Sequence, residues 1–541
     1  MTHREIFPSS WKMSRLLEIP AVVSLLLIVA LQSLSTEDVR FWDETVTLQL
    51  GLNVDTLGWA GWSRGATYID IYWLLGQFSS DPITIYFLMR VIAACSLVLG
   101  VWLATRLLTN RYIAWVIAAL AASLPITFVW PGVAGPAAGA VVVAMAVAMK
   151  WRSPIAMGVS SGLLWLAAGS RAEFTVAAVI GTALAIGWLV WLLIKRQEPL
   201  GGSTWSIVAV TLGSVLLPAL LFLRHGSPLE GWNRSFQAFA QHYGLRHRQP
   251  TDDMWQVSGG VVENTFPGAT SVVSAFLANP SAFLEHAFQN TLLAPVSLGG
   301  HLMAMEPGSL AEPTWAKGIA FTVIGSLALA LIVGGRNSWN RLRSLVSTLW
   351  APGRRVAFAL CLVISLNILI TIVTVYPRPH YLLVPTLILL VLVGIGLGRV
   401  GSPRFQVWLP FGVVVLFVLG YGLQVVSQMA DRVSNPPPYA VSLRALNSTD
   451  TQWKLLGTDR PVEPYVDSLT TIVPTITEGQ SFSEFLDSNE VNVSLVLPLI
   501  TFEPYAALPG FQEFYEDPSR FGFTQMAPES PFWVRADLYP R

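Results

Sequence analysis

Eleven long apolar stretches constrain the fold of this chain more than any other feature of its sequence. A helix that spans a bilayer needs about 20 mostly apolar residues. We therefore predict membrane-spanning helices over 17–34, 83–104, 112–131, 135–150, 156–171, 174–194, 205–223, 314–335, 356–376, 381–398 and 406–426. The stretch 291–305 is also apolar, but Pro295, Gly299 and Gly300 interrupt it, which is typical of a re-entrant or interfacial segment.

The composition agrees with a chain that lies mostly in lipid. Hydrophobic residues make up 53% of the 541 residues and charged residues only 12%, whereas a soluble domain carries about 25% charged residues. The 33 Lys and Arg balance the 33 Asp and Glu, so no bulk charge indicates a nucleic-acid partner. Cys95 and Cys361 fall inside apolar stretches and are interpreted as small buried hydrophobes.

The distribution of basic residues predicts the orientation in the membrane. The basic N-terminus followed by an apolar stretch is also typical of a signal peptide, but no Ala-x-Ala-like cleavage site follows, which favours a retained first helix. With the N-terminus in the cytoplasm, nearly all Lys and Arg of the short connections lie inside, and only Arg171 and Arg378 lie in short outer turns. The protein is therefore predicted to be a multi-pass integral protein, in the plasma (inner) membrane.

This orientation places three long segments outside the cytoplasm. The first outer loop, 35–82, is rich in Trp, Tyr and Leu and is predicted to form short interfacial helices. The long outer loop 224–313 is long enough to have a function or its own fold. After Asn435-Pro-Pro-Pro438, short strand-like runs predict a small extracytoplasmic α/β domain. The predicted fold class is an all-α polytopic membrane domain over 1–426, followed by an α/β domain over 427–541.

An acidic pair, Asp43 and Glu44, follows the first predicted helix directly after Phe41 and Trp42. Carboxylates at a membrane surface can act as a general base on a hydroxyl group. In the alternative interpretation, Asp43 only caps the N-terminus of a short interfacial helix. Adjacent acids can also hold a divalent metal, but two ligands do not define a metal site, so a metal cofactor stays open.

Arginines form a second group of candidates. Arg90 lies inside the second predicted helix, where its charge needs a partner or a water-filled cavity. An acid of the first outer loop is the structural alternative. Arg378 lies between two prolines in Tyr376-Pro-Arg-Pro-His-Tyr381, and its planar guanidinium suits a phosphate. The alternative role of Arg378 is an interfacial anchor.

Two further groups of polar residues lie in the outer segments. Arg171 and Glu173 lie in the outer turn Arg171-Ala-Glu173. The turn is selected because a basic residue in a short outer turn is an exception to the positive-inside bias. In the long outer loop, His242 and Arg246 are four residues apart and can share one helix face. We interpret the pair as acceptor or headgroup contacts, with a solvated face as the alternative.

The order of these motifs resembles that of the GT-C glycosyltransferases, in particular the branch of protein O-mannosyltransferases and lipid A aminoarabinose transferases. That pattern has Asp-Glu in the first outer loop, a Tyr-Tyr-Trp-Leu-like segment and an Arg near the next helix. Here Asp43-Glu44, Tyr68-Ile-Asp-Ile-Tyr72-Trp73-Leu and Arg90 follow in that order, with Ala66 and Thr67 where the family has paired prolines.

The resemblance implies a sugar donor linked to polyprenyl phosphate and a role for each candidate. The catalytic pair would be Asp43 and Glu44. The donor-phosphate contacts would be Arg378, Arg171, Arg90, Tyr381 and His380, and the substrate or acceptor contacts Arg64, Tyr68, Tyr72, His242 and Arg246. The acceptor is a glycan, a lipid or a protein. The alternatives are a transporter or lipid-linked glycan flippase, and an inactive membrane scaffold whose C-terminal domain binds a partner.

Overall fold

The computed structural model describes most of the chain between residues 18 and 538. The described residues are 18–35, 38–39, 43–59, 65–124, 126–129, 131–151, 153–195, 202–225, 230–247, 257–302, 340, 355–400, 412–413, 416–449, 451–456, 462–466, 468–472, 477, 479–496, 505 and 508–538.

The chain forms two compact units, each assembled from separate segments. The helical unit comprises the described residues of Met1–Ser33, Trp59–Tyr68 and Arg90–Val426. The mixed unit comprises those of Leu34–Gly58, Ile69–Met89 and Ser427–Arg541. The first outer loop is therefore shared between the two units.

The apolar helices coincide closely with the stretches predicted from the sequence. Five of them, within the described residues, are long and apolar enough to cross a membrane. These are α2 (Glu18–Ser35), α6 (Pro82–Leu108), η2 with α11 (Ala172–Phe174 and Thr175–Lys195), α18 (Arg355–Thr374) and α19 (Pro379–Val400). Helices α7 (Arg111–Ser123), α8 (Ile126–Val129), α9 (Pro131–Lys150), α10 (Pro154–Ser170) and α12 (Gly202–Leu223) match further predicted stretches.

Two predicted stretches are not tested in full. The stretch 314–335 lies outside the described residues. Of 406–426, the structure describes residues 412–413, the π-helix η4 (Leu416–Gly422) and the start of α21 (Leu423–Ser434). The predicted number of membrane-spanning helices therefore stays a prediction.

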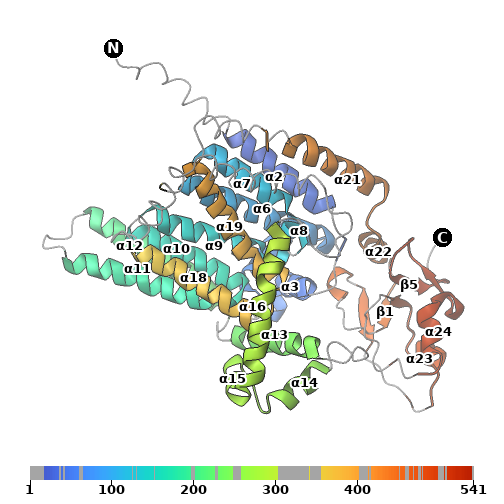
Figure 1. Ribbon diagram of the computed structural model, residues 1–541. Helices are drawn as coiled ribbons and strands as arrows, with labels where there is room; N and C mark the ends of the chain where they lie inside the picture. The colour runs from blue at the N-terminus through green and yellow to red at the C-terminus, as the bar shows by residue number, and fades with distance from the viewer. Residues whose placement is uncertain are drawn as a thin grey trace. The chain divides into compact units, whose positions relative to one another are not determined.

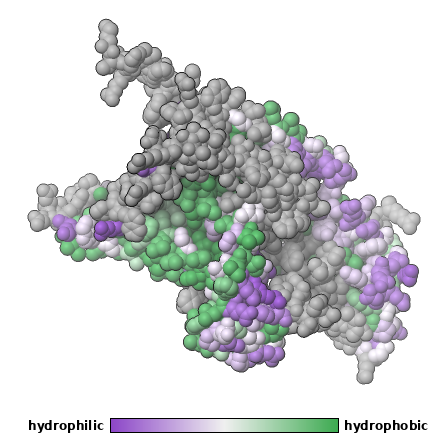
Figure 2. Space-filling model, in the orientation of Figure 1, coloured by the Kyte–Doolittle hydropathy of each residue, from purple (hydrophilic) through white to green (hydrophobic). Residues whose placement is uncertain are grey.

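Small residues allow the helices of the helical unit to pack closely. Helix α10 contacts α9, α11 and α12, which lie beside it in Figure 1. A Cβ on Gly162 of α10 would lie 2.3 Å from the carbonyl oxygen of Ser214, and one on Gly100 of α6 would lie 2.6 Å from the Cα of Gly139. Such close approach is typical of helices that pack in lipid. Hydrophobic side chains also cover the outer faces of α11 and α18 (Figure 2).

Four helices, α13 (Glu230–His247), α14 (Val257–Thr265), α15 (Val272–Ala278) and α16 (Pro280–Leu302), belong to the predicted long outer loop. Helix α16 continues through Pro295, so the stretch from 291 to 302 is helical and not broken as its Pro and Gly suggested. Leu284, Phe288, Leu292 and Val296 recur every four residues and are exposed. This apolar stripe gives α16 one hydrophobic face along its length.

The mixed unit contains short helices and one five-stranded sheet, as the sequence predicts for the first outer loop and for the C-terminal domain. The helices include α3 (Asp43–Leu52), α4 (Val54–Leu57), most of α5 (Ala66–Gly76), α22 (Pro438–Asn447), α23 (Phe482–Ser488) and α24 (Phe511–Glu516). The strands are β1 (Trp453–Leu456), β2 (Leu469–Ile472), β3 (Val493–Leu495), β4 (Phe523–Gln525) and β5 (Phe532–Arg535).

The strand order is β2-β1-β3-β5-β4. Strand β1 pairs in parallel with β2 and β3, whereas β5 pairs antiparallel with β3 and β4. Aromatic side chains of α23 and α24, among them Phe482, Phe485 and Phe514, form the core of this domain.

Candidate functional site

Arg171 lies at the turn between α10 and η2 and is mostly buried. Its Nε and Nη2 both lie 2.8 Å from Oε1 of Glu173, and 14% of its side chain is exposed. The guanidinium carbon is 5.1 Å from the centre of the Tyr381 ring, in the first turn of α19. The side-chain amide of Asn367 on α18 donates to the carbonyl oxygen of Glu173. Contacts from α18 and α19 therefore hold this turn.

Arg378 lies in the turn that joins α18 to α19. Its backbone N–H donates to the carbonyl of Tyr376 at 2.9 Å, and its carbonyl accepts from the N–H groups of Tyr381 and Leu382 at 3.0 Å. These bonds fix the backbone of Arg378 at the start of α19. The sequence prediction of an arginine on a stiff turn agrees with this arrangement.

His242 and Arg246 lie on one face of α13, as their spacing predicts. The His242 ring stacks on Tyr376 with a centroid distance of 5.1 Å and an interplanar angle of 10°. The Arg246 guanidinium lies 5.7 Å from the centre of the same ring. Since only 6% of His242 is exposed, the alternative of a solvated face is wrong for this residue.

Two residues that the sequence analysis did not select complete the surroundings of Arg246. Its Nη1 lies 3.3 Å from Nδ1 of His286, and its Nη2 donates to Oδ1 of Asn290 at 2.8 Å. Both residues lie on α16 and are almost fully buried. Asn290 in turn donates to the carbonyl of Val373 at 2.8 Å. His286 and Asn290 are four residues apart and share one face of α16, opposite the apolar stripe, but this spacing alone does not indicate that the face is buried.

Burial, helped by neighbouring charges, keeps the two histidines neutral. Burial lowers the pKa of His242 to about 3, and the charges of Arg378, His286 and Arg246 act in the same direction. Burial also lowers the pKa of His286 to about 4, against a hydrogen bond with Val375 that raises it, and Arg246 lowers it further. Arg378 therefore acts electrostatically on the same group as Arg246.

Arg171, Arg246 and Arg378 thus converge on the turn Val375–Tyr381, and we call them the arginine cluster. A cavity of about 20 Å³ lies beside Arg171 and is also lined by Glu173, His380 and Tyr381. A space of this size accommodates one water-sized group. The structure therefore brings together six residues selected from the sequence: Arg171, Arg378, His380, Tyr381, His242 and Arg246.

Arg90 is buried in α6, and its Nη2 donates to the backbone carbonyl of Phe128 at 3.3 Å. The described partner of the Arg90 side chain is therefore a backbone carbonyl of the helical unit. Tyr68 is also buried in this unit, with 4% of its surface exposed. Whether Arg90 and Tyr68 contact a substrate stays a prediction.

Glu44 lies in the mixed unit, in the first turn of α3. It is 9% exposed and accepts a hydrogen bond from the Tyr86 hydroxyl at 3.5 Å. The hydroxyl of the next residue, Thr45, lies 3.4 Å from that of Tyr465 in the C-terminal domain. The rings of Tyr86 and Tyr465 meet edge to face at 6.2 Å. Glu44 therefore contacts the Tyr86 hydroxyl, and Tyr86 in turn contacts Tyr465, which lies far away in the sequence.

The other acid of the pair, Asp43, is the first residue of α3, and its side chain lies outside the described part, as does Arg64 as a whole. Tyr72 is buried in the mixed unit, and its Cβ lies 2.4 Å from the position that a Cβ on Gly51 would take. Tyr72 therefore packs directly against the backbone of α3. Among the described residues, no group of three or more His, Cys, Asp or Glu could hold a metal ion.

No protein-family model and no curated protein matches the chain. Among solved structures, it is similar to the oligosaccharyltransferase of Archaeoglobus fulgidus in the apo form, with 12% identity, a TM-score of 0.36 and coverage of 80% of this chain. The chain spans only 58% of the length of that protein.

A second structure is the Archaeoglobus fulgidus oligosaccharyltransferase AglB in complex with an inhibitory peptide and a dolichol-phosphate. The identity is 12%, the TM-score 0.38, and the match covers 87% of this chain and 69% of that chain. Likenesses of this degree leave the function to be argued from the residues of the chain itself.

Proposed function

We propose that this protein is a membrane glycosyltransferase of the GT-C type that moves a sugar from a polyprenyl-phosphate-linked donor to an acceptor hydroxyl group. The observation that carries the proposal is the arginine cluster. It joins three cations from three separate elements around one turn. A phosphate is the part of such a donor that needs this environment.

The balance of charge around the cluster favours an anionic ligand. Glu173 offsets the charge of Arg171, while the described hydrogen-bond partners of Arg246 are the neutral His286 and Asn290. Because the pKa values of His242 and His286 are lowered to about 3 and about 4, neither ring adds a charge near neutral pH. A phosphate would compensate the positive charge of Arg246.

The proposed reaction forms one C–O bond and breaks another. A carboxylate, Asp43 first and Glu44 second, accepts the proton of the acceptor hydroxyl while the oxygen attacks the anomeric carbon. The bond between that carbon and the phosphate oxygen breaks on the opposite face, so the configuration inverts. Polyprenyl phosphate leaves with the bonding electrons, and the arginines stabilise its growing charge. The carboxylic acid then returns its proton to the solvent.

One further observation favours an enzyme over a transporter or flippase. A transporter needs ionisable groups along the middle of several helices. In the described parts of the apolar helices, Arg90 is the only buried residue with a charged side chain (Arg, Lys, Asp or Glu). The three residues of the arginine cluster lie instead at a helix end or in turns. We propose an integral membrane location with the N-terminus in the cytoplasm and transfer on the outer side.

Sugar transfer from polyprenyl-phosphate donors tests the proposal directly. The full chain is reconstituted in lipid nanodiscs and incubated with polyprenyl-phosphate-linked hexoses and membrane extract as the acceptor source. We expect transfer by the wild type and its loss in Asp43→Asn, because an amide cannot accept the proton. Asp55→Asn, an exposed acid of the neighbouring helix α4, is the matched control and should remain active.

If Asp43→Asn keeps wild-type turnover and Glu44→Gln loses it, Glu44 is the base. If both variants keep wild-type turnover, no carboxylate of this pair is the base. If the folded wild type instead transfers no sugar from any donor but releases the donor or moves it across the bilayer, that result rejects the enzyme in favour of a transporter.

A further inference from the structure

A polar cleft of about 650 Å³ opens in the mixed unit, and none of the residues that line it was assigned to chemistry above. Its walls come from the residues before α6, from the end of α22 and from the connections to β1 and β2. The volume lies within the range of about 300–1,000 Å³ of small-molecule sites. Such sites are usually apolar, but eight of the nine residues that line this one have polar side chains, and Pro82 is the exception.

Among the described residues that line the cleft, the charged side chains of Asp81 and Arg444 form an ion pair. Nη2 of Arg444 lies 3.2 Å from Oδ2 of Asp81 and 3.4 Å from the hydroxyl of Thr84. Partial burial raises the pKa of Asp81, but hydrogen bonds from Thr84 and Ile83 and the charge of Arg444 outweigh it, and the pKa is lowered. Asp81 therefore stays ionised and the pair is neutral as a whole, which disfavours a strongly charged ligand.

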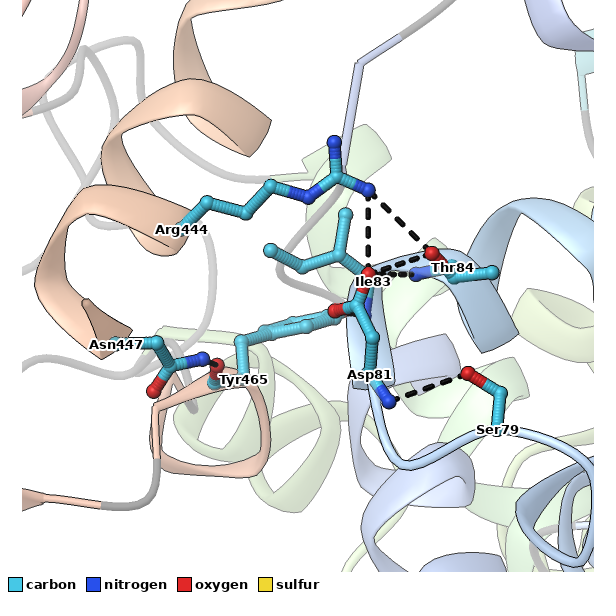
Figure 3. A network of polar contacts seen from close by, with 7 residues as sticks. All are labelled: Ser79, Asp81, Ile83, Thr84, Arg444, Asn447 and Tyr465. Carbon is cyan, nitrogen blue, oxygen red and sulfur yellow. Dashed lines mark hydrogen bonds and ion pairs between the residues drawn. The ribbon is translucent and has the colours of Figure 1, made fainter.

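The ion pair still offers hydrogen-bonding groups to a ligand. Figure 3 shows that Arg444 approaches Asp81 and Thr84 with one terminal nitrogen, while its other terminal nitrogen points away from them. Oδ1 of Asp81 accepts one described bond, from the N–H of Ile83 at 3.1 Å. A carboxylate oxygen accepts about two hydrogen bonds. A donor and an acceptor are thus held side by side in a fixed geometry.

The remaining walls extend this alternation of donors and acceptors. The hydroxyls of Ser448 and Thr449 donate to the carbonyls of Ala445 and Leu446 at 2.8 and 3.1 Å. Since each hydroxyl has one donor and two lone pairs, both keep acceptor capacity. The side chain of Gln452 adds an amide that both donates and accepts. A ligand with many hydroxyl groups matches this surface, because each hydroxyl also donates and accepts.

We propose that this cleft binds a neutral, hydroxyl-rich saccharide. The binding follows from the cleft alone. Its use in catalysis rests on the glycosyltransferase function proposed above, where the cleft would hold sugar units of the acceptor glycan or of the lipid-linked donor. The two sources share one chemistry, and kinetics separate them.

Saccharide binding is measured by saturation-transfer NMR on the full chain in phosphatidylcholine nanodiscs, because glycoside detergents would compete. The neutral probes are maltotriose, mannotriose and triacetylchitotriose, and the charged probe is trigalacturonate. We expect at least one neutral probe to bind with a Kd of about 0.1–10 mM, and about tenfold more tightly than trigalacturonate. This readout needs no transferase activity, so it tests the cleft even if the proposed function is wrong.

Two variants change the cleft and two matched variants do not. Ser448→Trp fills it, and Gln452→Ala removes one amide while the backbone carbonyl that accepts from Asn492 remains. We expect at least about a tenfold weaker Kd for Ser448→Trp and about threefold for Gln452→Ala, as for one lost hydrogen bond. Ser488→Trp and Gln512→Ala change exposed residues of α23 and α24 outside the cleft and should leave the Kd unchanged.

Any one of three results overturns the proposal: no neutral probe binds, trigalacturonate binds more tightly than the neutral probes, or Ser448→Trp leaves the binding unchanged. In transfer assays, Gln452→Ala should raise KM for a glycan acceptor if the acceptor occupies the cleft, and KM for the donor if the donor sugar does. Unchanged values of both KM, with weakened saccharide binding, would keep the site but reject its role in transfer.

Discussion

Arg378 and Arg246 are embedded in different ways, although both act on His242. The backbone of Arg378 is fixed by hydrogen bonds in the turn before α19, whereas the Arg246 side chain is fixed by His286 and Asn290. Burial lowers the pKa of Arg246, so this guanidinium gains from an anionic partner. A phosphate between the two would make use of both charges.

At the residue scale, Arg378→Lys should reduce turnover by about 10²–10³-fold, the typical loss for one group that stabilises transition-state charge. Lysine keeps the charge but cannot contact two phosphate oxygens through a planar fork. Arg355→Lys, at the exposed start of α18, is the matched control. Donor-dependent kinetics of the two variants check this, and wild-type kcat and KM in Arg378→Lys would make Arg378 an interfacial anchor.

The lowered pKa values of His242 and His286 predict a loss of stability in acid. Both rings titrate near pH 6.5 when unfolded but only near about 3 and about 4 when folded. Below pH 6.5 the unfolded chain therefore binds more protons, and stability falls as the pH falls. At pH 5 each ring should cost about 2 kcal/mol relative to pH 7.

Thermal unfolding of the chain in nanodiscs between pH 5 and 7.5, followed by tryptophan fluorescence, measures this dependence. His242→Asn or His286→Asn should flatten it, whatever either variant does to the stability at pH 7.5. His247→Gln, at an exposed ring of the same helix, should change the slope least. A wild-type slope in both buried-site variants would mean that other groups cause the acid sensitivity.

From sequence, candidate residues could be selected where one charge stood out against an apolar background, and their roles stay predictions. Arg171 and Arg378 were found because few basic residues lie in the short outer turns. His286 and Asn290 escaped detection because they belong to an amphipathic helix with many polar residues. Their burial depends on the packing of α13 and α18 against α16, and a single helix pattern does not carry that information.

At the element scale, the carboxylate of Asp38 caps a helix that lies far away in the sequence. Its two oxygens accept hydrogen bonds from the N–H groups of Tyr439 and Ala440 at 2.6 and 3.1 Å. These groups belong to the first turn of α22, which has no capping side chain of its own at Pro437. The cap is therefore supplied by the first outer loop.

Asp38→Ala should lower the opening free energy of α22 by about 1–2 kcal/mol, as for the loss of an N-cap. Hydrogen exchange of the peptide that covers α22 measures it, and exchange should become roughly tenfold faster. Asp38→Asn keeps one acceptor oxygen and should lie between the wild type and Asp38→Ala. Asp55→Ala removes an exposed carboxylate from α4 and should change nothing. Equal exchange in all four proteins would remove the capping role.

Most apolar helices could be predicted from sequence to within a few residues, because lipid imposes one length and one composition on a spanning helix. Helix α16 was the exception. Its Pro295, Gly299 and Gly300 suggested a break, but the described helix runs to Leu302. Contacts with α18 and α19 support it, so tertiary packing outweighs the local preference of these residues.

At the scale of the whole molecule, the charge bias predicts that the C-terminal domain lies outside the cytoplasm. After replacement of Cys95 and Cys361 by Ala, Arg520→Cys should react with a membrane-impermeant maleimide in intact cells. Lys195→Cys, exposed at the basic end of α11, should react only after permeabilisation. The reverse pattern would invert the topology and move the proposed reaction to the cytoplasmic side.

The assembly of the mixed unit has a consequence for the synthesis of the protein. Asp38 and Tyr439 are 401 residues apart. At roughly 5–20 residues per second, the ribosome needs roughly 20–80 s to travel from one to the other. Throughout that interval the α22 cap, the contacts of Thr45 and Tyr86 with Tyr465 and the saccharide cleft are all incomplete. The mixed unit is therefore the last part of the protein to mature, although its first segment begins at Leu34.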